Sequence, residues 1–143
     1  MREILFRGKR KNNGEWVEGD LLRAAWYIDE KEHNYIFTDA TAYPSCEFVG
    51  YEEVDPETVG QFTGLTDKNG KKIFEGDIVK HYHDRQFPQS YQKGVIFWCE
   101  EYLHWKRTAN QYLTCCIAND CIYEVIGNIH DNPELLCGKE GDV

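Results

Sequence analysis

A sequence pattern that occurs twice constrains the fold of this chain more than any other feature. Residues 11–22 read KNNGEWVEGDLL, and residues 68–79 read KNGKKIFEGDIV, with one additional residue before Glu-Gly-Asp in the second copy. Later in each half come two apolar residues and a glycine, at 48–50 and at 125–127. In both halves an Asp-Pro or Asn-Pro pair begins five residues after that glycine. Similar segments that recur in the same order indicate repeated structural units.

These two copies predict the domain organisation. We expect two related small β units of unequal length, over residues 1–60 and 61–138, followed by a frayed tail at 139–143. In each copy the glycine of Glu-Gly-Asp permits a bulge or a sharp bend, and the flanking acids keep that bend at the surface. The duplicated segments are therefore expected at equivalent bends of the two units.

Turn-forming residues and short apolar runs predict a mainly β protein. Asn13-Gly14 and Asn69-Gly70 are typical of hairpins, because a type I′ turn needs positive φ at both central residues. The aromatic residues (4 Trp, 9 Tyr and 7 Phe) favour strands, since they fit a half-buried pleated surface. Proline after Asp or Asn predicts short helical turns at 56–61 and 133–137 only. The predicted strands are 4–7, 16–25, 35–38, 46–51, 62–66, 72–82, 94–102, 112–117 and 122–129.

The second unit has the order of elements found in SH3-like barrels. A Gly-Asp-apolar-apolar step is followed by a loop at 84–92, a long strand that begins near Gly94, and further short strands. We therefore predict an SH3-like barrel over residues 61–138. The stretch 95–105 is apolar on both faces. One face can fill the barrel, and the other must be covered by the first unit or by a second subunit.

Charge is unevenly distributed along this acidic chain, whose formal net charge is −9. Residues 2–11 hold five basic side chains and one acid (+4), whereas residues 12–60 hold two basic side chains and twelve acids (−10). A net negative chain repels phosphate backbones, so its charge disfavours nucleic-acid binding. The basic segment is either a solvated hairpin flank, a phosphate contact, or a contact to an acidic face in the same or a neighbouring subunit.

Export and membrane insertion are also disfavoured. No run of about 18 apolar residues is present, and the N-terminal residues lack the apolar core of a signal peptide. The six cysteines contain no Cys-x-x-Cys pair, so we expect reduced thiols that pack as small hydrophobic side chains. These features predict a cytoplasmic protein without membrane contact.

The histidines do not form a convincing metal motif. His81 and His83 would project from one face of a strand, as in some zinc sites. No second pair with ligand spacing accompanies them, and they lie where the strand runs out into a loop. We therefore expect no metal and no other cofactor.

The acidic pairs do not predict catalysis. Glu18/Asp20 and Glu75/Asp77 could hold a divalent cation or serve acid–base chemistry. Their presence in both copies of the repeat favours a shared structural bend instead. The stretch 29–31 reads Asp-Glu-Lys, which matches only the last part of a metal nuclease motif, in a polar turn. No phosphate-binding loop, nucleophile elbow or zinc-protease motif is present, so we expect no catalytic residues.

Candidate partner contacts follow from the charge distribution and from the doubly apolar stretch. The opposite charges of 2–11 and 12–60 suit head-to-tail contact between copies. Exposed ion pairs are worth only about 0–1 kcal/mol each, so apolar contact must dominate. We predict a homo-oligomer whose interface includes the basic hairpin. The candidate contact residues are Arg7, Lys9, Arg10, Lys11, Trp98 and Trp105.

Four segments carry a family resemblance. They are REILFRG at 2–8, WVEG at 16–19, VDPETVGQFTGLTDKNGKKIFEGDIV at 54–79 and YEVIGNIHDNPEL at 123–135. Together they resemble the YopX family. The resemblance implies a protein encoded by a bacteriophage or prophage, acting in the bacterial cytoplasm. It implies no known activity, and it provides no catalytic residues to transfer.

Two functions from different classes remain open. The first is a non-enzymatic binding or assembly module that acts through protein–protein contacts, including contact with a host or phage protein. The alternative is a nucleic-acid-related role, either as an acidic mimic of nucleic acid or as a weakly binding barrel. The charge of −9 favours mimicry over direct binding.

Overall fold

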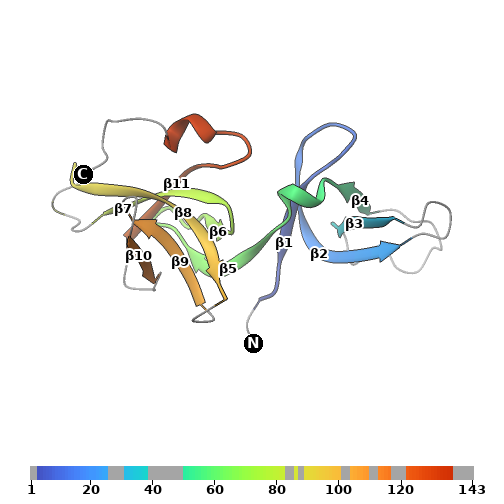
Figure 1. Ribbon diagram of the computed structural model, residues 1–143, viewed down its shortest axis with the longest axis horizontal. Coiled ribbons are helices and arrows are strands. Elements are labelled where there is room, and N and C mark those ends of the chain that lie inside the picture. The colour runs from blue at the N-terminus through green and yellow to red at the C-terminus, as the bar shows by residue number, and fades with distance from the viewer. Residues whose placement is uncertain are drawn as a thin grey trace. The chain divides into compact units, whose positions relative to one another are not determined.

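The computed structural model describes residues 3–25, 31–38, 50–82, 86, 89–100, 104–109, 113–116 and 122–136. The chain divides into two compact units, Met1–Phe62 and Thr63–Val143, which are described separately below. Both units are built from antiparallel strands, so the predicted mainly β class is confirmed (Figure 1).

The strands and short 3-10 helices follow one another along the chain. Those that belong wholly to the first unit are β1 (Phe6–Lys9), β2 (Trp16–Ala25), β3 (Glu32–Phe37), β4 (Tyr51–Val54) and η2 (Pro56–Thr58). Strand β5 (Gly60–Thr66) begins in the first unit and ends in the second. The second unit continues with β6 (Lys72–Phe74), β7 (Asp77–Tyr82), β8 (Tyr91–Cys99), β9 (His104–Ala109), β10 (Leu113–Cys116), β11 (Ile122–Asn128) and η3 (Pro133–Leu136).

The first unit is organised by the β1–β2 hairpin and by the order β4-β3-β2-β1-β5 within its sheet. The turn lies where the sequence predicts it, because Gly14 has a φ of 72° and its N–H donates to the carbonyl oxygen of Arg10 at 2.9 Å. Asp55 caps η2 by accepting a hydrogen bond from the N–H of Glu57. This is the N-cap role expected of an Asp before proline.

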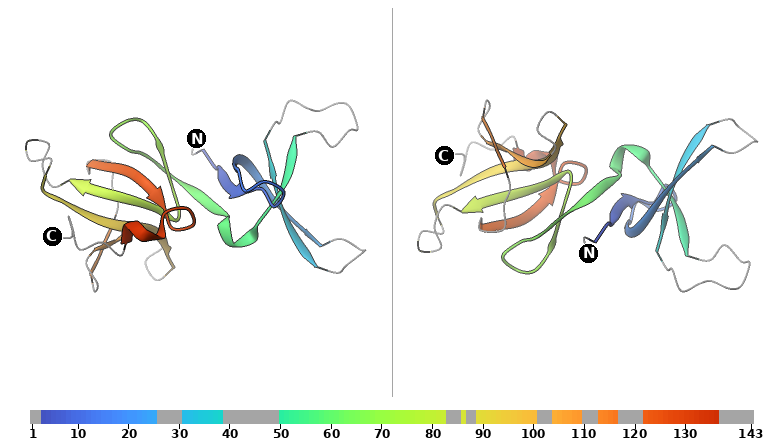
Figure 2. Two further views of the ribbon diagram at one scale, coloured as in Figure 1. Left: turned by 90° about the horizontal axis from the view of Figure 1, so that it is seen from above. Right: turned by 90° about the horizontal axis from the view of Figure 1, so that it is seen from below.

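The core of the first unit is small and tightly packed. Val17, Ile36 and Val54 are buried together. Gly19 lies in the middle of β2, where an added Cβ would overlap the backbone carbonyl of Phe37. A side chain would therefore separate β2 from β3, which explains why glycine occupies this position. Figure 2 shows these strands from two sides.

The second unit holds a five-stranded sheet in the order β10-β9-β8-β7-β11. Its core contains Ile73, Val79, Ile96 and Tyr123. The β5–β6 hairpin turns at Asp67, whose carboxylate accepts hydrogen bonds from the N–H groups of two turn residues and of Val125 in β11. The predicted Asn-Gly turn at 69–70 thus also joins the hairpin to the sheet.

The SH3-like barrel predicted over residues 61–138 is not confirmed, because the described strands form two sheets and no closed barrel. Strand β5 pairs with β1, and β6 has only three residues. The hairpin reaches β11 through the Asp67 carboxylate, a backbone bond from Lys68 to Tyr123 and the Lys68–Glu124 ion pair, rather than through a described ladder. A strand that begins in one unit and ends in the other leaves little length for closing a barrel.

The internal repeat is not confirmed as a structural repeat, since the two Glu-Gly-Asp segments adopt different conformations. Gly19 lies inside β2 and pairs with Phe6 of β1. Gly76 lies in the turn between β6 and β7 and has a φ of 88°. The expectation of equivalent bends is therefore wrong. In the second copy the buried Asp77 carboxylate accepts the N–H of Phe74 across the turn.

Other elements also differ from the sequence prediction. The last two residues of the helical turn expected at 56–61 lie in β5, and the last two residues of the loop expected at 84–92 lie in β8. The strand expected over 72–82 is divided by the Glu75-Gly76 turn into β6 and β7, because the buried Asp77 carboxylate accepts the N–H of Phe74 and stabilises the turn. Residues 46–49 of the strand expected at 46–51 lie outside the described part. The strand that the structure describes nearby is β4 (Tyr51–Val54), which shares only Tyr51 with the prediction. Strand β9 was not predicted.

Candidate interaction surfaces

The first two candidate contact residues share an aromatic neighbour within the first unit. The guanidinium carbon of Arg7 lies 4.7 Å from the centre of the Trp16 ring, and the Lys9 ammonium lies 5.6 Å from the centre of the same ring. In the β1–β2 register Lys9 is directly opposite Trp16, and Arg7 is diagonal to it. The contacts with the ring therefore follow from strand pairing. Arg7 is only 8% exposed. Its charge is thus held by the fold against an aromatic face.

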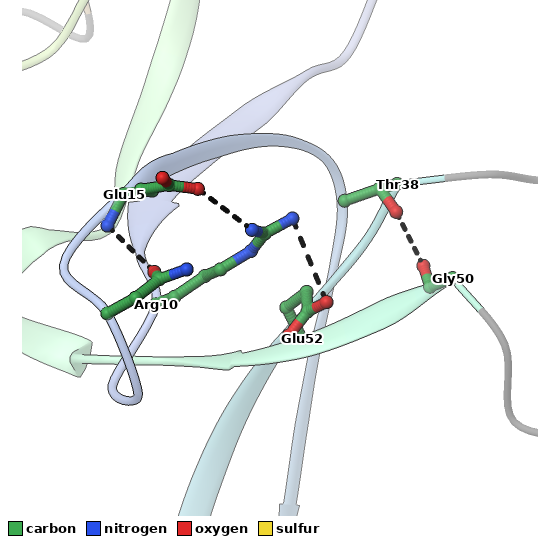
Figure 3. Close-up of polar contacts among 6 residues, drawn as sticks. Arg10, Glu15, Thr38, Gly50 and Glu52 are labelled. Carbon is green, nitrogen blue, oxygen red and sulfur yellow. Dashed lines mark hydrogen bonds and ion pairs between the residues drawn. The ribbon is translucent and has the colours of Figure 1, made fainter.

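The other two basic residues contact acids of the same unit. Arg10 lies 3.1 Å from Glu15 and 3.7 Å from Glu52, and Figure 3 shows its guanidinium between the two carboxylates. Lys11 Nζ lies 3.2 Å from Glu53 Oε1. The basic segment therefore contacts acidic strand β4 of its own subunit, which is one of the alternatives that its charge left open.

Backbone pairing explains why these charges meet. Arg10 and Val54 form an isolated antiparallel bridge, and the N–H of Lys11 donates to the carbonyl oxygen of Glu53 at 3.0 Å. At the other end of β4, Thr38 donates to the carbonyl oxygen of Gly50 (Figure 3). Two acids of β4 are therefore fixed beside the basic turn.

Glu53 is the most highly connected of these acids. His33 Nδ1 lies 2.5 Å from Glu53 Oε1, and Lys11 approaches the same oxygen. The hydrogen bond from His33 and the contact with Lys11 hold the pKa of Glu53 below its ordinary value of 4.5, against the opposing effect of burial. Glu53 thus remains ionised and joins β3, β4 and the basic turn.

The outer face of β2, β3 and β4 carries a cluster of aromatic and apolar side chains. The register places Asp20, Phe37 and Tyr51 in one cross-strand row. The next row contains Leu22, Tyr35 and Glu53.

Side chains from both rows touch. The Tyr51 ring lies 5.4 Å from that of Tyr35 and 5.9 Å from that of Phe37. Leu22 remains 44% exposed and Phe37 37% exposed. Sequence reasoning missed this face, although Tyr35 and Phe37 alternate with the core residues Asn34 and Ile36 and could have revealed it.

Trp98 lies in β8 and packs half-buried against the core of the second unit. Trp105 is its partner across the β8–β9 ladder, but the Trp105 side chain lies outside the described part.

On the opposite face of β8, Val95, Phe97 and Cys99 are half-buried. On the same side of β8, Lys93 Nζ donates to the carbonyl oxygen of Leu135 in η3 at 2.9 Å. This contact between β8 and η3 was not predicted.

His81 takes part in a partly buried polar contact of the second unit. Its Nδ1 lies 2.8 Å from Nη2 of Arg107, which is 1% exposed, and its ring lies 4.9 Å from that of Tyr123. His83, the other half of the proposed metal pair, lies outside the described residues. Among the side chains that are described, no three His, Cys, Asp or Glu groups converge as metal ligands.

The two acidic pairs differ in their surroundings. Glu18 and Asp20 are exposed on the outer face of β2. Asp77 is 1% exposed and accepts the N–H of Phe74 at 2.8 Å, so its role in the turn is structural. Residues 29 and 30 of the third acidic stretch lie outside the described part.

A polar cluster joins three elements of the second unit. The Tyr82 hydroxyl donates to Glu124 Oε2 at 2.6 Å, and Lys68 Nζ lies 3.1 Å from the same oxygen. These contacts hold the pKa of Glu124 below its ordinary value. Burial and the hydrogen bond to Glu124 raise the pKa of Tyr82 to about 12.

Two further features concern thiols and membranes. Cys99 is a free thiol. Within the described ranges, no helix is long and apolar enough to cross a membrane.

Comparison with known proteins identifies the family. The YopX family model, described as "YopX protein", matches residues 5–137. The chain belongs to the YopX family. The resemblance in the four quoted segments is therefore confirmed over most of the length. No curated protein matches this YopX chain.

A solved structure also resembles this YopX protein. The crystal structure of protein EF1440 from Enterococcus faecalis is 26% identical in sequence and aligns with a TM-score of 0.55. The match covers 95% of this chain and 99% of that chain.

Proposed function

We propose that this YopX protein is a non-enzymatic binding module that works through protein–protein contacts, including contacts between its own copies. The observation that supports this most strongly is the outer face of β2–β4, where Leu22 and Phe37 are exposed beside the rings of Tyr35 and Tyr51. Large aromatic side chains with a polar tip are enriched at protein interfaces, because they provide contact area at low entropic cost.

Self-association has separate support in the second unit. Val95, Phe97 and Cys99 form the second apolar face of β8 and are only half-buried by their own chain. Covering this face with another copy would remove the remaining apolar surface from water. The Arg10 and Lys11 ion pairs are satisfied within one subunit, so charge contributes little to this association.

Light scattering tests self-association. The proposal predicts a mass several-fold above 16.8 kDa that changes little with salt. A monomer at high protein concentration would refute self-association. An oligomer that dissociates in modest salt would show that charge, and not apolar contact, holds it together.

The family resemblance extends the proposal to a cellular setting. YopX resemblance implies a protein encoded by a bacteriophage or prophage, so we place its action in the bacterial cytoplasm. Its partner would then be a host or phage protein. Expression from a prophage, followed by fractionation of the host cells, tests this setting, and recovery outside the cytoplasmic fraction would contradict it.

A nucleic-acid mimic is the second candidate function. It is favoured by the exposed carboxylates of Glu18 and Asp20 and by the balance of −10 over residues 12–60. A mimic would compete with DNA for a basic host protein, and its binding would disappear in high salt. Direct nucleic-acid binding has less support, because the basic turn contacts Glu15, Glu52 and Glu53.

A further inference from the structure

We propose that the outer face of β2–β4 binds an arginine- or lysine-rich segment of another protein. For brevity this surface, formed by Glu18, Asp20, Leu22, Tyr35, Phe37 and Tyr51, is called the outer face. The inference rests on the proposed binding function and adds the chemistry of the partner. Its basis is the juxtaposition of exposed carboxylates with exposed aromatic and apolar groups on one side of a three-stranded sheet.

The strand register places carboxylate and aromatic groups side by side. Asp20 is directly opposite Phe37, and Phe37 is directly opposite Tyr51. Glu18 projects from the same side of β2, and both acids are exposed. An arginine or lysine that lies over the Phe37 ring would therefore be within the reach of a carboxylate. This combination favours a cation, because ring faces and carboxylates both attract positive charge.

The apolar groups argue against a purely ionic contact. Leu22 and Phe37 are exposed by 44% and 37%, and the two tyrosine rings lie between and beside them. Aliphatic stems of arginine and lysine can cover such a surface while their charged ends reach the acids. A nucleic acid would bring phosphates to the same carboxylates and be repelled.

The basic residues of the chain's own N-terminal turn are not suitable occupants. Arg7 is buried against Trp16, and Arg10 and Lys11 contact acids of their own unit. A second copy would have to break these contacts before its turn could bind the outer face. A basic segment from a different protein has no such cost, which is why we assign the face to a partner of another sequence.

Fluorescence anisotropy on the full-length protein tests this assignment. The probe is a labelled peptide of alternating arginine and glycine, compared with a glutamate–glycine peptide of equal length and a single-stranded DNA oligonucleotide. We expect only the arginine peptide to bind. Phe37→Ser and Leu22→Ser should each weaken it by about tenfold, the effect typical of truncating a central contact. Asp20→Asn should weaken it by roughly twofold to fivefold.

Matched variants elsewhere in the first unit control for general effects. Ile4→Ser removes another exposed apolar side chain, and Glu57→Gln removes an exposed acid of η2. Both should leave the affinity unchanged. Unfolding midpoints show whether each variant remains folded. If either Phe37→Ser or Leu22→Ser fails to fold, the other still tests the apolar contact.

Four results would overturn the assignment. They are no binding of the arginine peptide, equal binding by outer-face and control variants, preference for the acidic peptide, and preference for the oligonucleotide. An oligomer mass in light scattering with no peptide binding would remove this inference and leave the proposed function intact. A monomer that binds the peptide through the outer face would support this inference and refute self-association.

Discussion

Lys11 Nζ lies 3.2 Å from Glu53 Oε1, and this contact joins the most basic segment of the chain to its acidic strand β4 within one unit. The side chains of both residues are partly exposed. Charge complementarity, which the sequence suggests as a contact between copies, is thus at least partly satisfied inside one copy.

The coupling between Lys11 and Glu53 should be small. A double-mutant cycle with Lys11→Ala and Glu53→Gln is expected to give a coupling free energy of about 0–1 kcal/mol in chemical unfolding, decreasing as salt is added. The physical reason is that water screens a partly exposed pair. A coupling well above this range that does not respond to salt would show a dry, buried pair instead.

The two copies of Glu-Gly-Asp should respond differently to the same substitution. Asp77→Ala removes the acceptor of the buried Phe74 N–H and should lower the free energy of unfolding by about 1–3 kcal/mol. The matched change Asp20→Ala removes an exposed acid from β2 and should cost less than about 0.5 kcal/mol. Equal losses in urea unfolding would contradict the structural role that we assign to Asp77.

Residue patterns predicted the strands and turns well where local chemistry determines them. The Asn13-Gly14 turn, the strand over 16–25 and the Asp-Pro start of η2 require only local information. The two Glu-Gly-Asp copies differ in which carboxylate is buried, since Asp77 is buried and Asp20 is exposed. The burial of one carboxylate and not the other is a consequence of tertiary packing, which two identical tripeptide sequences do not reveal.

The candidate surface was predicted only in part. The sequence singled out the basic hairpin, whose partners in β4 became visible only when backbone pairing placed Glu52 and Glu53 beside it. The outer face depends on the register of three strands, including a β4 that lies later in the chain than predicted. Cross-strand rows cannot be read without that register.

Tyr82 should titrate at unusually high pH. Its pKa is raised from 10.0 to about 12 in the folded protein, so this tyrosine stabilises the fold below pH 10. That contribution is lost as the pH rises from 10 towards 12, because the unfolded chain ionises first. Ultraviolet titration of the phenolates should show a late step that Tyr82→Phe removes. A late step that persists in the variant would assign it to another tyrosine.

His81 should carry its proton on Nε2. A guanidinium can only donate, so Nδ1 of His81, 2.8 Å from Arg107 Nη2, must be the acceptor and hold no proton. Nitrogen chemical shifts of the imidazole, measured by nuclear magnetic resonance, distinguish the two tautomers. A protonated Nδ1 would mean that Arg107 contacts another group instead of His81.

The function proposed for this YopX protein is the binding of another protein through apolar and aromatic contact. The most direct measurement is quantitative affinity capture from bacterial host cells with the wild-type chain, with Phe37→Ser and with the control Ile4→Ser, followed by binding of the purified captured protein. We expect one protein to be retained by the wild type and by Ile4→Ser, to be lost with Phe37→Ser, and to bind in purified form with the same ranking. Identical sets of proteins retained by all three chains would contradict it.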